Sequence, residues 1–346
     1  MKVLVNSQDK VYLTSGNKAL KAKEKCGLTI GDFIGNIDSN NTLQKPTQEI
    51  VADFSGVEDL GNYALSNKFQ GNTNISSISF PDLTTVSGQY ALNYMCQGNT
   101  NLTTFSFSEL TSISGQYAFY YAFNGSRIIS ISFPKLTTIT GPFVFSNAFN
   151  NNSQTLTSIS FPELTSVTAA SVFASAFSSN NSLTSISFPK LATIVGNSAF
   201  SSAFSYSTAL TDVEFPELTS ISAIYNGAVF SNTFQGDSAL RTVRFPKLST
   251  IEITGGSTSG GSFTICFHSC SALTDIYFNA LTTTSFVGSI WQFNAMFNTS
   301  SMSTSGNVNI HFPSNLQATI QGLQGYPNFG ATAGRVTLLF DLTATS

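Results

Sequence analysis

The chain has 346 residues, of which 41% are hydrophobic and 10% are charged, and its formal net charge is −3. Phe alone occurs 31 times, so the chain can bury a large core but has few side chains for acid–base chemistry. Residues 1–45 carry seven Lys and Arg against four acids, whereas the remainder carries eight against fourteen, a balance of −6. This acidic remainder argues against a nucleic acid as partner, because a phosphate backbone attracts basic groups.

Residues 1–45 are predicted to form an N-terminal cap or attachment segment, with short strands over residues 2–6 and 10–14. A cluster of four lysines in this segment is interpreted as a solvated face: Lys18, Lys21, Lys23 and Lys25. No apolar run approaches the roughly 18 residues that span a membrane, and the N-terminus lacks the continuous apolar core of a secretory signal. We therefore expect no membrane span. Either the chain is not exported through a secretory signal, or that signal has been removed, and both alternatives stay open.

One phrase, Ile-x-Phe-Pro or a variant of it, recurs through residues 46–316 and marks about ten repeat units. Successive copies are 26 to 28 residues apart up to Phe215 and 30 to 34 apart beyond it. Such a period is the signature of a solenoid, in which each unit buries its apolar face against the next. The Phe residues that mark the copies are Phe54, Phe80, Phe107, Phe133, Phe161, Phe188, Phe215, Phe245, Phe278 and Phe312.

Each unit is predicted to contain one short strand and one short helical turn. In the clearest copy, Ile186-Ser-Phe188 alternates in the manner of a strand, and Pro189 ends the strand because proline has no N–H for the sheet. Later in this unit Phe200 and Phe204 lie four residues apart, which puts both rings on one side of a helical turn. The other pairs with this spacing are Leu65/Phe69, Phe119/Phe123, Phe145/Phe149, Phe173/Phe177 and Phe230/Phe234.

The pattern LxxIxFPxLxxI followed by AFxxxF resembles leucine-rich repeats, and most closely the BspA-like leucine-rich-repeat family of bacterial cell-surface proteins. The resemblance covers residues 46–316. It implies an α/β repeat solenoid: a right-handed leucine-rich-repeat-like stack with a parallel β-sheet on the concave face and short helical turns opposite. It also implies an extracellular or cell-surface location and adhesin-like binding of host proteins.

A charged residue stands two positions after the marker Phe in seven units, and from Glu109 onward its sign alternates. Because neighbouring strands of a sheet lie about 4.8 Å apart, these side chains are expected to form a lateral row of acid–base contacts. The row would oppose a register slip, which sets like charges side by side. Its members are Asp82, Glu109, Lys135, Glu163, Lys190, Glu217 and Lys247.

The outward positions of the strands, three and one residues before each marker Phe, are predicted to form one continuous face for binding. In five consecutive units these positions hold small hydroxyl residues: Ser77 and Ser79, Thr104 and Ser106, Ser130 and Ser132, Ser158 and Ser160, and Ser185 and Ser187. The next four units carry Asp212 and Glu214, Thr242 and Arg244, Asp275 and Tyr277, and Asn309 and His311.

Loop insertions at residues 255–261 and 299–305 fall in the same C-terminal units, and functional segments concentrate in such loops. We therefore predict a ligand-binding patch of hydrogen-bonding and charged groups that suits a sugar or a polar protein surface. Its residues are Asp212, Glu214, Arg244, Asp275, Tyr277 and His311.

Three other interpretations of this face stay open. Glu214 and Arg244 hold equivalent positions in adjacent units, so they can simply pair with each other, with Asp275 diagonal to Arg244. The Ser/Thr array can itself bind a regular surface or ice-like water. Asp212, Glu214 and Asp275 can ligate Ca²⁺, although nothing in their spacing requires it.

Residues 317–346 are predicted to form a C-terminal cap with a final strand over residues 335–342. Among the four cysteines, Cys96 stands where other units place Phe and is interpreted as a core residue. Cys266 and Cys270 lie four residues apart, which permits a bond or, with His268, a zinc site that lacks a fourth ligand. We expect no metal and no cofactor.

The function predicted from these features is a non-enzymatic binding or adhesion module that presents its polar face to a host protein or glycan. The chain has two histidines, no GxSxG motif and no phosphate-binding loop of the Walker type, so we expect no catalysis. The alternatives are a phage or surface-assembly component that recognises a receptor, and a purely structural spacer. The sequence does not indicate an oligomeric state.

Overall fold

The computed structural model describes residues 2–5, 11–15, 18–21, 50–54, 56–73, 75–152, 155–224, 228–254, 262–282, 296–297, 307–321 and 336–343. Cys26, the insertions at 255–261 and 299–305, and most of residues 1–45 lie outside these described residues. Predictions that fall on them therefore stay predictions.

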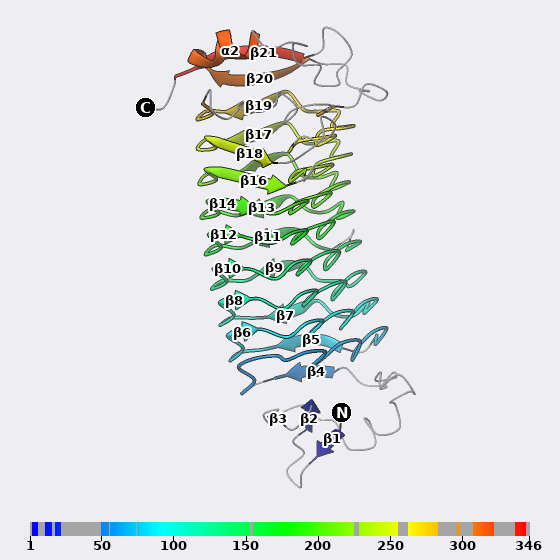
Figure 1. Cartoon of the computed structure of the whole chain (residues 1–346). Helices are drawn as coiled ribbons and strands as arrows, with labels where there is room; N and C mark the ends of the chain where they lie inside the picture. Colours follow the sequence, from blue (N-terminus) through cyan, green and yellow to red (C-terminus); the bar gives the residue numbers. More distant parts are fainter. Residues whose placement is uncertain are drawn as a thin grey trace.

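The repeat units stack into a single column of parallel strands, a parallel-strand β-solenoid (Figure 1). One side of the column, here called the first sheet face, carries one strand from each unit. Its strands are β4 (Ile50–Asp53), β5 (Ile75–Ser79), β7 (Thr104–Ser106), β9 (Ser130–Ser132), β11 (Ser158–Ser160), β13 (Ser185–Ser187), β15 (Asp212–Glu214), β17 (Thr242–Phe245), β19 (Asp275–Phe278) and β20 (Val308–Pro313).

A second sheet, absent from the sequence prediction, runs along an adjacent side of the column. It is a continuous seven-stranded sheet, and each strand contains a Ser or Thr followed by an Ile or Val, a few residues after the marker Phe of its unit. Most of these strands have two or three residues, too few to show an alternating pattern in the sequence. They are β6 (Thr85–Val86), β8 (Ser112–Ile113), β10 (Thr138–Ile139), β12 (Ser166–Val167), β14 (Thr193–Val195), β16 (Ser220–Ile224) and β18 (Thr250–Thr254).

The register of the first sheet face is the one that the repeat predicts, because equivalent residues of successive units are neighbours in space. Ile159 lies between Ile131 and Ile186, and Ser160 lies between Ser132 and Ser187. The isoleucines point inward and the serines outward, as the period of two requires. Hydrogen bonding on this face divides into three sheets, β4-β5-β7, β9-β11-β13 and β15-β17-β19-β20-β21.

Three stacks of phenylalanine rings run through the interior of the column, among the buried Leu, Ile, Val and Ala side chains. The marker Phe residues from Phe54 to Phe312 stack with centroids 4.5 to 6.1 Å apart and planes within 15° of parallel. A second stack runs from Phe119 to Phe263 at 4.9 to 5.5 Å. A third runs from Phe123 to Phe297 at 5.3 to 6.0 Å. Each stacked pair contributes roughly 0.5–1.5 kcal/mol beyond its buried area.

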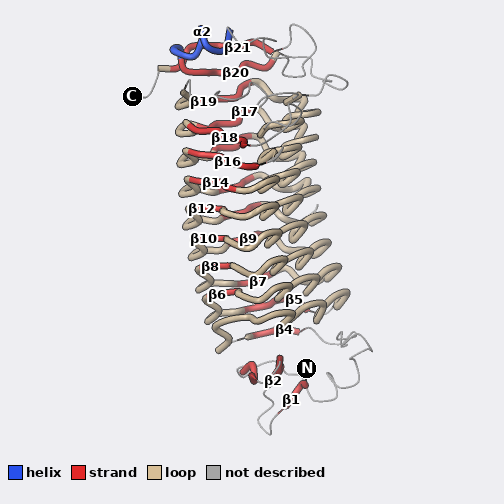
Figure 2. Tube along the Cα trace, in the orientation of Figure 1, coloured by secondary structure: helices blue, strands red, loops and turns tan. Residues whose placement is uncertain are grey.

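The predicted helical turns are wrong, and with them the α/β class. Among the described residues the α-helix is a single short one, α2 (Gln317–Gln321), after the 3-10 turn η3 (Ser314–Leu316). The AFxxxF segments instead form what we call the turn column, which occupies residues 61–72, 88–99, 115–126, 141–152, 169–180, 196–207, 228–237 and 262–270 (Figure 2).

The hydrogen bonds of the turn column explain why it is not helical. Every second backbone N–H donates a hydrogen bond to the carbonyl oxygen three residues earlier, as Met95 N–H does to Leu92 O at 3.1 Å. The remaining N–H groups donate to carbonyl oxygens of the next unit, as Leu92 N–H does to Ala118 O at 2.7 Å. Every fourth residue has a positive φ, such as Tyr90 at 54° and Tyr94 at 51°. A four-residue period therefore places the Phe side chains on one side of the turn column without an α-helix. Residues with positive φ cost conformational energy, and the hydrogen bonds between units offset that cost.

The charged row forms as separate pairs within the described part of the chain. Lys135 lies 2.6 Å from Glu109, Lys190 lies 2.6 Å from Glu163, and Lys247 lies 2.7 Å from Glu217. The predicted contacts between neighbours are confirmed at these three steps. All six side chains are about half exposed, so each pair contributes about 0–1 kcal/mol.

The two ends differ from the repeats. At the N-terminus β1 (Lys2–Val5), β2 (Val11–Ser15) and β3 (Lys18–Lys21) form an antiparallel sheet, which confirms the two predicted strands and adds a third. At the C-terminus the predicted final strand is β21 (Val336–Leu342), which pairs in parallel with β20. No helix in the described ranges has the length and apolar content needed to cross a membrane.

Candidate functional site

The predicted patch residues lie on four neighbouring strands of the first sheet face, β15, β17, β19 and β20. Strand pairing aligns them in two lateral rows. One row contains Asp212, Thr242, Asp275 and Asn309, and the other contains Glu214, Arg244, Tyr277 and His311. We call the two rows together the C-terminal patch. Each residue occupies an outward position because the apolar residue beside it, such as Val243 or Ile276, enters the core.

Arg244, Tyr277 and His311 stack on one another along their row. The guanidinium carbon of Arg244 lies 4.8 Å from the centroid of the Tyr277 ring. The other face of Tyr277 packs against the His311 imidazole, with centroids 4.2 Å apart and planes 11° from parallel. Cation–π and ring contacts of this kind hold three polar side chains in fixed orientations.

His311 is held between two carboxylates and is 8% exposed. Its Nε2 lies 3.0 Å from Asp275 Oδ1, and its Nδ1 lies 2.9 Å from Asp341 Oδ2. Both nitrogens can donate when the imidazole carries both hydrogens. Asp341 belongs to β21 and was missed by the sequence analysis, since 30 residues separate it from His311 and no repeat unit marks it. His311 therefore orients its neighbours rather than offering a free surface.

The two aspartates of the patch have pKa values below their ordinary range. Burial alone would raise the pKa of Asp275, but hydrogen bonds from His311, Asn309 and Thr274 outweigh it and lower the pKa. A hydrogen bond from the Thr242 hydroxyl lowers the pKa of Asp212. Both carboxylates are therefore anionic near neutral pH, which suits an electrostatic contact better than proton transfer.

The pairing of Glu214 with Arg244, which the sequence left open, is not what the structure shows. No ion pair joins these two described side chains, although they are neighbours in register. Arg244 lies over Tyr277 and donates from Nη1 to Thr242 Oγ1 at 2.9 Å. Glu214 and Asp212 are exposed beside it, so both carboxylates face solvent next to the oriented guanidinium.

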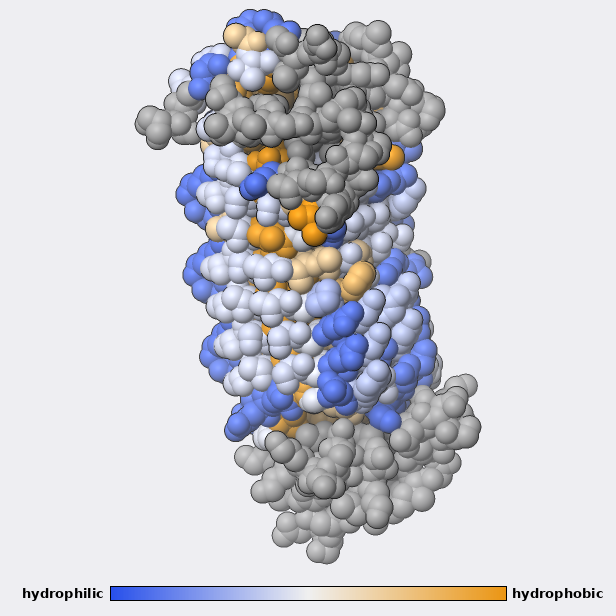
Figure 3. Space-filling model, in the orientation of Figure 1, coloured by the Kyte–Doolittle hydropathy of each residue, from blue (hydrophilic) through white to orange (hydrophobic). Residues whose placement is uncertain are grey.

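The remaining N-terminal part of the first sheet face is the hydroxyl array expected from the sequence. Its outward side chains are Ser or Thr from β5 to β13 and are partly or fully exposed. On the side of the column that the space-filling view draws, the described surface is also mostly pale, with hydrophobic patches nearer the C-terminal end (Figure 3). The outward side chains of the first sheet face therefore change from hydroxyl residues to charged and aromatic residues between β13 and β15.

The cysteines of the described region are buried free thiols. Cys266 and Cys270 are not bonded to each other, and Cys270 Sγ donates to Phe234 O at 2.9 Å. Burial raises the pKa of both thiols well above the ordinary value, so they stay protonated. Within the described residues no three His, Cys, Asp or Glu side chains are grouped as a metal site. Cys96 is fully buried, as expected of a core residue.

A buried carboxyl, Asp237, was not singled out from the sequence. Its Oδ1 accepts the Ser207 N–H at 2.7 Å, while Oδ2 has no partner among the described groups. Burial raises the pKa of Asp237 well above the ordinary value. Two units earlier the equivalent residue is Asn180, whose Nδ2 donates to Phe177 O at 2.6 Å. Asp237 thus occupies an asparagine position of the stack, where burial favours the neutral form of its carboxyl.

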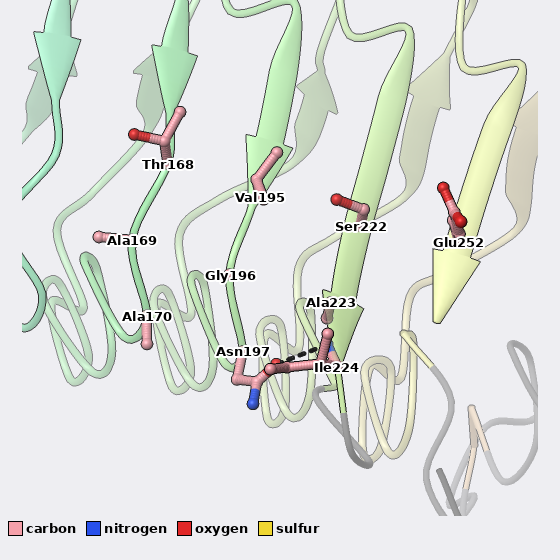
Figure 4. A pocket seen from close by; sticks show the side chains of 10 residues that line it. All are labelled: Thr168, Ala169, Ala170, Val195, Gly196, Asn197, Ser222, Ala223, Ile224 and Glu252. Carbon is pink, nitrogen blue, oxygen red and sulfur yellow. Dashed lines mark hydrogen bonds between the residues drawn. The ribbon is translucent and has the colours of Figure 1, made fainter. Parts of the chain in front are cut away.

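A groove of about 380 Å³ crosses the second sheet where β14, β16 and β18 meet the turn column (Figure 4). Val195, Ser222 and Glu252 lie in one lateral row across it, and Asn197 Oδ1 accepts the Ile224 N–H at 2.9 Å. Glu252 is the one charged residue of its lining, which is Thr168, Ala169, Ala170, Val195, Gly196, Asn197, Ser222, Ala223, Ile224 and Glu252. The side chains that line the groove do not form a recognisable binding or catalytic arrangement, and we assign the groove no function.

Parallel strands, a repeat of about 27 residues and internal ladders define a leucine-rich-repeat solenoid. The chain belongs to the BspA type Leucine rich repeat family: six copies of that region match over residues 52–122, 98–254 and 146–317. No curated protein matches the chain.

Two solved structures are similar to the chain over much of their length. A leucine-rich repeat protein from Bacteroides ovatus is 13% identical, with 95% of this chain and 98% of that chain covered and a TM-score of 0.27. The T. pallidum leucine rich repeat protein is 16% identical, with 69% and 90% covered and a TM-score of 0.32.

Proposed function

We propose that this protein is a non-enzymatic binding module that holds a host protein at a cell surface through the C-terminal patch. The observation that carries the proposal is the change of chemistry along one face. Five units present hydroxyls there, and the next four present charged and aromatic groups. A solenoid needs its interior to repeat but not its outward positions, so this local change reflects a role other than folding.

The chemistry of the patch favours a protein partner. Asp212 and Glu214 are exposed, Arg244, Tyr277 and Asp275 are partly exposed, and His311 is buried. Arg and Tyr are enriched at the energetic centres of protein interfaces, and their stacking here reduces the entropy lost on binding. Two carboxylates beside a guanidinium suit a surface that offers both charge signs. A glycan is the alternative ligand.

The end segments fit a module with a closed stack. We propose that residues 1–45 are an N-terminal cap or attachment segment, 46–316 the solenoid and 317–346 a C-terminal cap. Supporting this division, Phe340 of β21 stacks on Phe312 with centroids 6.0 Å apart, which covers the last layer of marker rings. Membership of the BspA-type family supports a cell-surface location.

The test is a binding screen of the full chain against immobilised extracellular-matrix proteins and glycans. We expect a matrix protein to bind the full chain and to lose affinity for the Arg244→Ala/Tyr277→Ser variant. The matched control is Ser132→Ala/Ser160→Ala on the hydroxyl array of the same face. If the Arg244→Ala/Tyr277→Ser variant instead loses affinity for a glycan, the patch binds sugars. If both variants bind equally well, the patch is not the binding site.

The two other roles give different results in that screen. A spacer binds no member of the panel, with or without the patch substitutions. A phage or surface-assembly component is indicated by tail genes beside its coding gene, whereas export genes there favour an adhesin.

A further inference from the structure

We propose that the turn column of the first four units is a second binding surface, which takes a neutral linear polysaccharide. The surface, here called the tyrosine platform, consists of seven aromatic side chains: Tyr63, Tyr90, Tyr94, Tyr117, Tyr120, Tyr121 and Phe143. It lies at the other end of the stack from the C-terminal patch and on a different side. The inference is independent of the function proposed for that patch.

The rings of the platform form two rows parallel to the solenoid axis. In the first row Tyr63 stacks on Tyr90 at 5.2 Å, and Tyr90 on Tyr117 at 4.9 Å. The row continues from Tyr117 to Phe143 at 4.7 Å. In the second row Tyr94 stacks on Tyr121 at 5.2 Å.

Solvent reaches both rows of the platform. Tyr63 is 57% exposed and the other rings are partly exposed. Because stacked rings cover one another's faces, the edges and hydroxyls form the accessible surface.

The fold does not require aromatic residues at these positions. Ser171 and Ser198 occupy the positions of Tyr90 and Tyr117 in later units, with φ of 54° and 56° against 54° and 55° for the tyrosines. The backbone is thus the same with a serine as with a tyrosine. A run of aromatic rings in the first four units alone therefore reflects a surface property and not a demand of the stack.

The platform is uncharged and rich in hydrogen-bonding groups. Burial raises the pKa of Tyr94, and it raises the pKa of Tyr120 to about 12, so these phenols stay neutral. Amide pairs flank the rings: Gln89 Nε2 donates to Gln116 Oε1 at 3.4 Å, and Gln70 Nε2 donates to Gln97 Oε1 at 2.7 Å. In residues 61–72, 88–99, 115–126 and 141–152 the single charged residue is Lys68.

These properties select a neutral glycan as the occupant. Phenol hydroxyls and amides exchange hydrogen bonds with sugar hydroxyls, while ring edges pack against sugar C–H groups. The absence of clustered charge in the four segments makes an anionic polymer or a highly charged protein a poor fit. The rings of the first row recur every 4.7 to 5.2 Å along the axis. This spacing is close to the length of one pyranose unit in an extended polysaccharide, so successive sugars can contact successive rings.

The test is native affinity electrophoresis of the full chain in gels containing hydroxyethylcellulose, a neutral β-linked glucan. We expect the polymer to retard the chain and the Tyr63→Ser/Tyr90→Ser/Tyr117→Ser variant to bind about tenfold more weakly. Ser171→Tyr/Ser198→Tyr should lengthen the first row and strengthen retardation. Arg244→Ala/Tyr277→Ser leaves the platform intact and should be retarded like the parent chain.

Two results overturn the proposal. One is an unretarded parent chain. The other is equal retardation of the parent and the triple-serine variant, each shown to be folded by its circular dichroism and melting transition. If the parent chain binds no glucan and the triple-serine variant loses affinity for a protein of the matrix panel, the platform binds a protein. The glycan assignment is then wrong.

Discussion

Tyr277 and His311 stack face to face with ring centroids 4.2 Å apart, and this contact joins β19 to β20 near the end of the column. His311 also contacts Asp341 of β21 at 2.9 Å, so one buried imidazole links the last repeats to the terminal strand. The same side chain therefore supports both the orientation of Tyr277 and the closure of the stack.

Replacing this imidazole should destabilise the C-terminal end. His311→Ala removes the stack and the contacts with the carboxylates of Asp275 and Asp341, and we expect a loss of about 1–3 kcal/mol in the free energy of unfolding by urea. Asp341→Asn is the graded control, since half of the Asp341 side chain is exposed and its loss should cost less. Identical urea transitions for His311→Ala and the parent chain would show that the link carries no stability.

Asp237 predicts a pH-dependent gain on mutation. In the unfolded chain its carboxyl ionises near its ordinary value of about 3.9, whereas burial raises the pKa of the folded state. Stability from this group is therefore complete below pH ~3.9 and is lost as the pH rises towards the folded pKa. Asp237→Asn should be more stable than the parent at neutral pH, with the difference vanishing in acid.

The matched control for that prediction is Asn180→Asp, which places a carboxyl at an equivalent buried position. It should destabilise the chain at neutral pH and less in acid. Thermal melts of both variants across the pH range give the measurement, and a pH-independent difference for Asp237→Asn would contradict the assignment of a protonated carboxyl.

Glycines at the corner between the second sheet and the turn column set the spacing of the units. A Cβ added at Gly115 would lie 2.1 Å from Gly88 O, which is backbone and cannot rotate away. We expect Gly115→Ala to destabilise the chain by about 1–3 kcal/mol through overpacking. Gly61→Ala is the control, because a Cβ there meets nothing within 4 Å. Equal melting temperatures for the two variants would contradict this packing.

The charged pairs should act on register more than on stability. Lys190→Glu sets a like charge beside Glu163 and should lower the melting temperature slightly at low salt, within the 0–1 kcal/mol typical of exposed pairs. The swap Glu163→Lys/Lys190→Glu should restore it. Because salt screens exposed charges, the effect should disappear at high ionic strength; persistence there would point to another cause.

Much of this architecture could be predicted because a repeat converts sequence spacing into spatial contact. The alignment of Glu109 with Lys135, and of Glu214 with Arg244, followed from the period and the side-chain alternation alone. The turn column could not be predicted, since the four-residue spacing of Phe145 and Phe149 fits an α-helix equally well. Positive φ at non-glycine residues such as Tyr94 leaves no mark in a sequence.

The candidate site was predictable in its members but not in its contacts. Register placed Arg244 beside both Glu214 and Tyr277, and only the side-chain conformations decide that it lies over the ring. Asp341 comes from outside the repeats, so no period brings it to His311. Asp237 did leave a signal, because it stands where Asn180 stands two units earlier and a carboxyl in a buried row is unusual.

We propose that folding of this chain depends on the repeated interior, whereas binding depends on the C-terminal patch. The most direct measurement is the dissociation constant of the first matrix protein captured in the screen, by surface plasmon resonance, for the parent chain and two variants. We predict at least about tenfold weaker binding by Arg244→Ala/Tyr277→Ser and no change in Ser132→Ala/Ser160→Ala. Parent-like affinity of the Arg244→Ala/Tyr277→Ser variant, with its melting transition intact, would contradict a role of the C-terminal patch in binding.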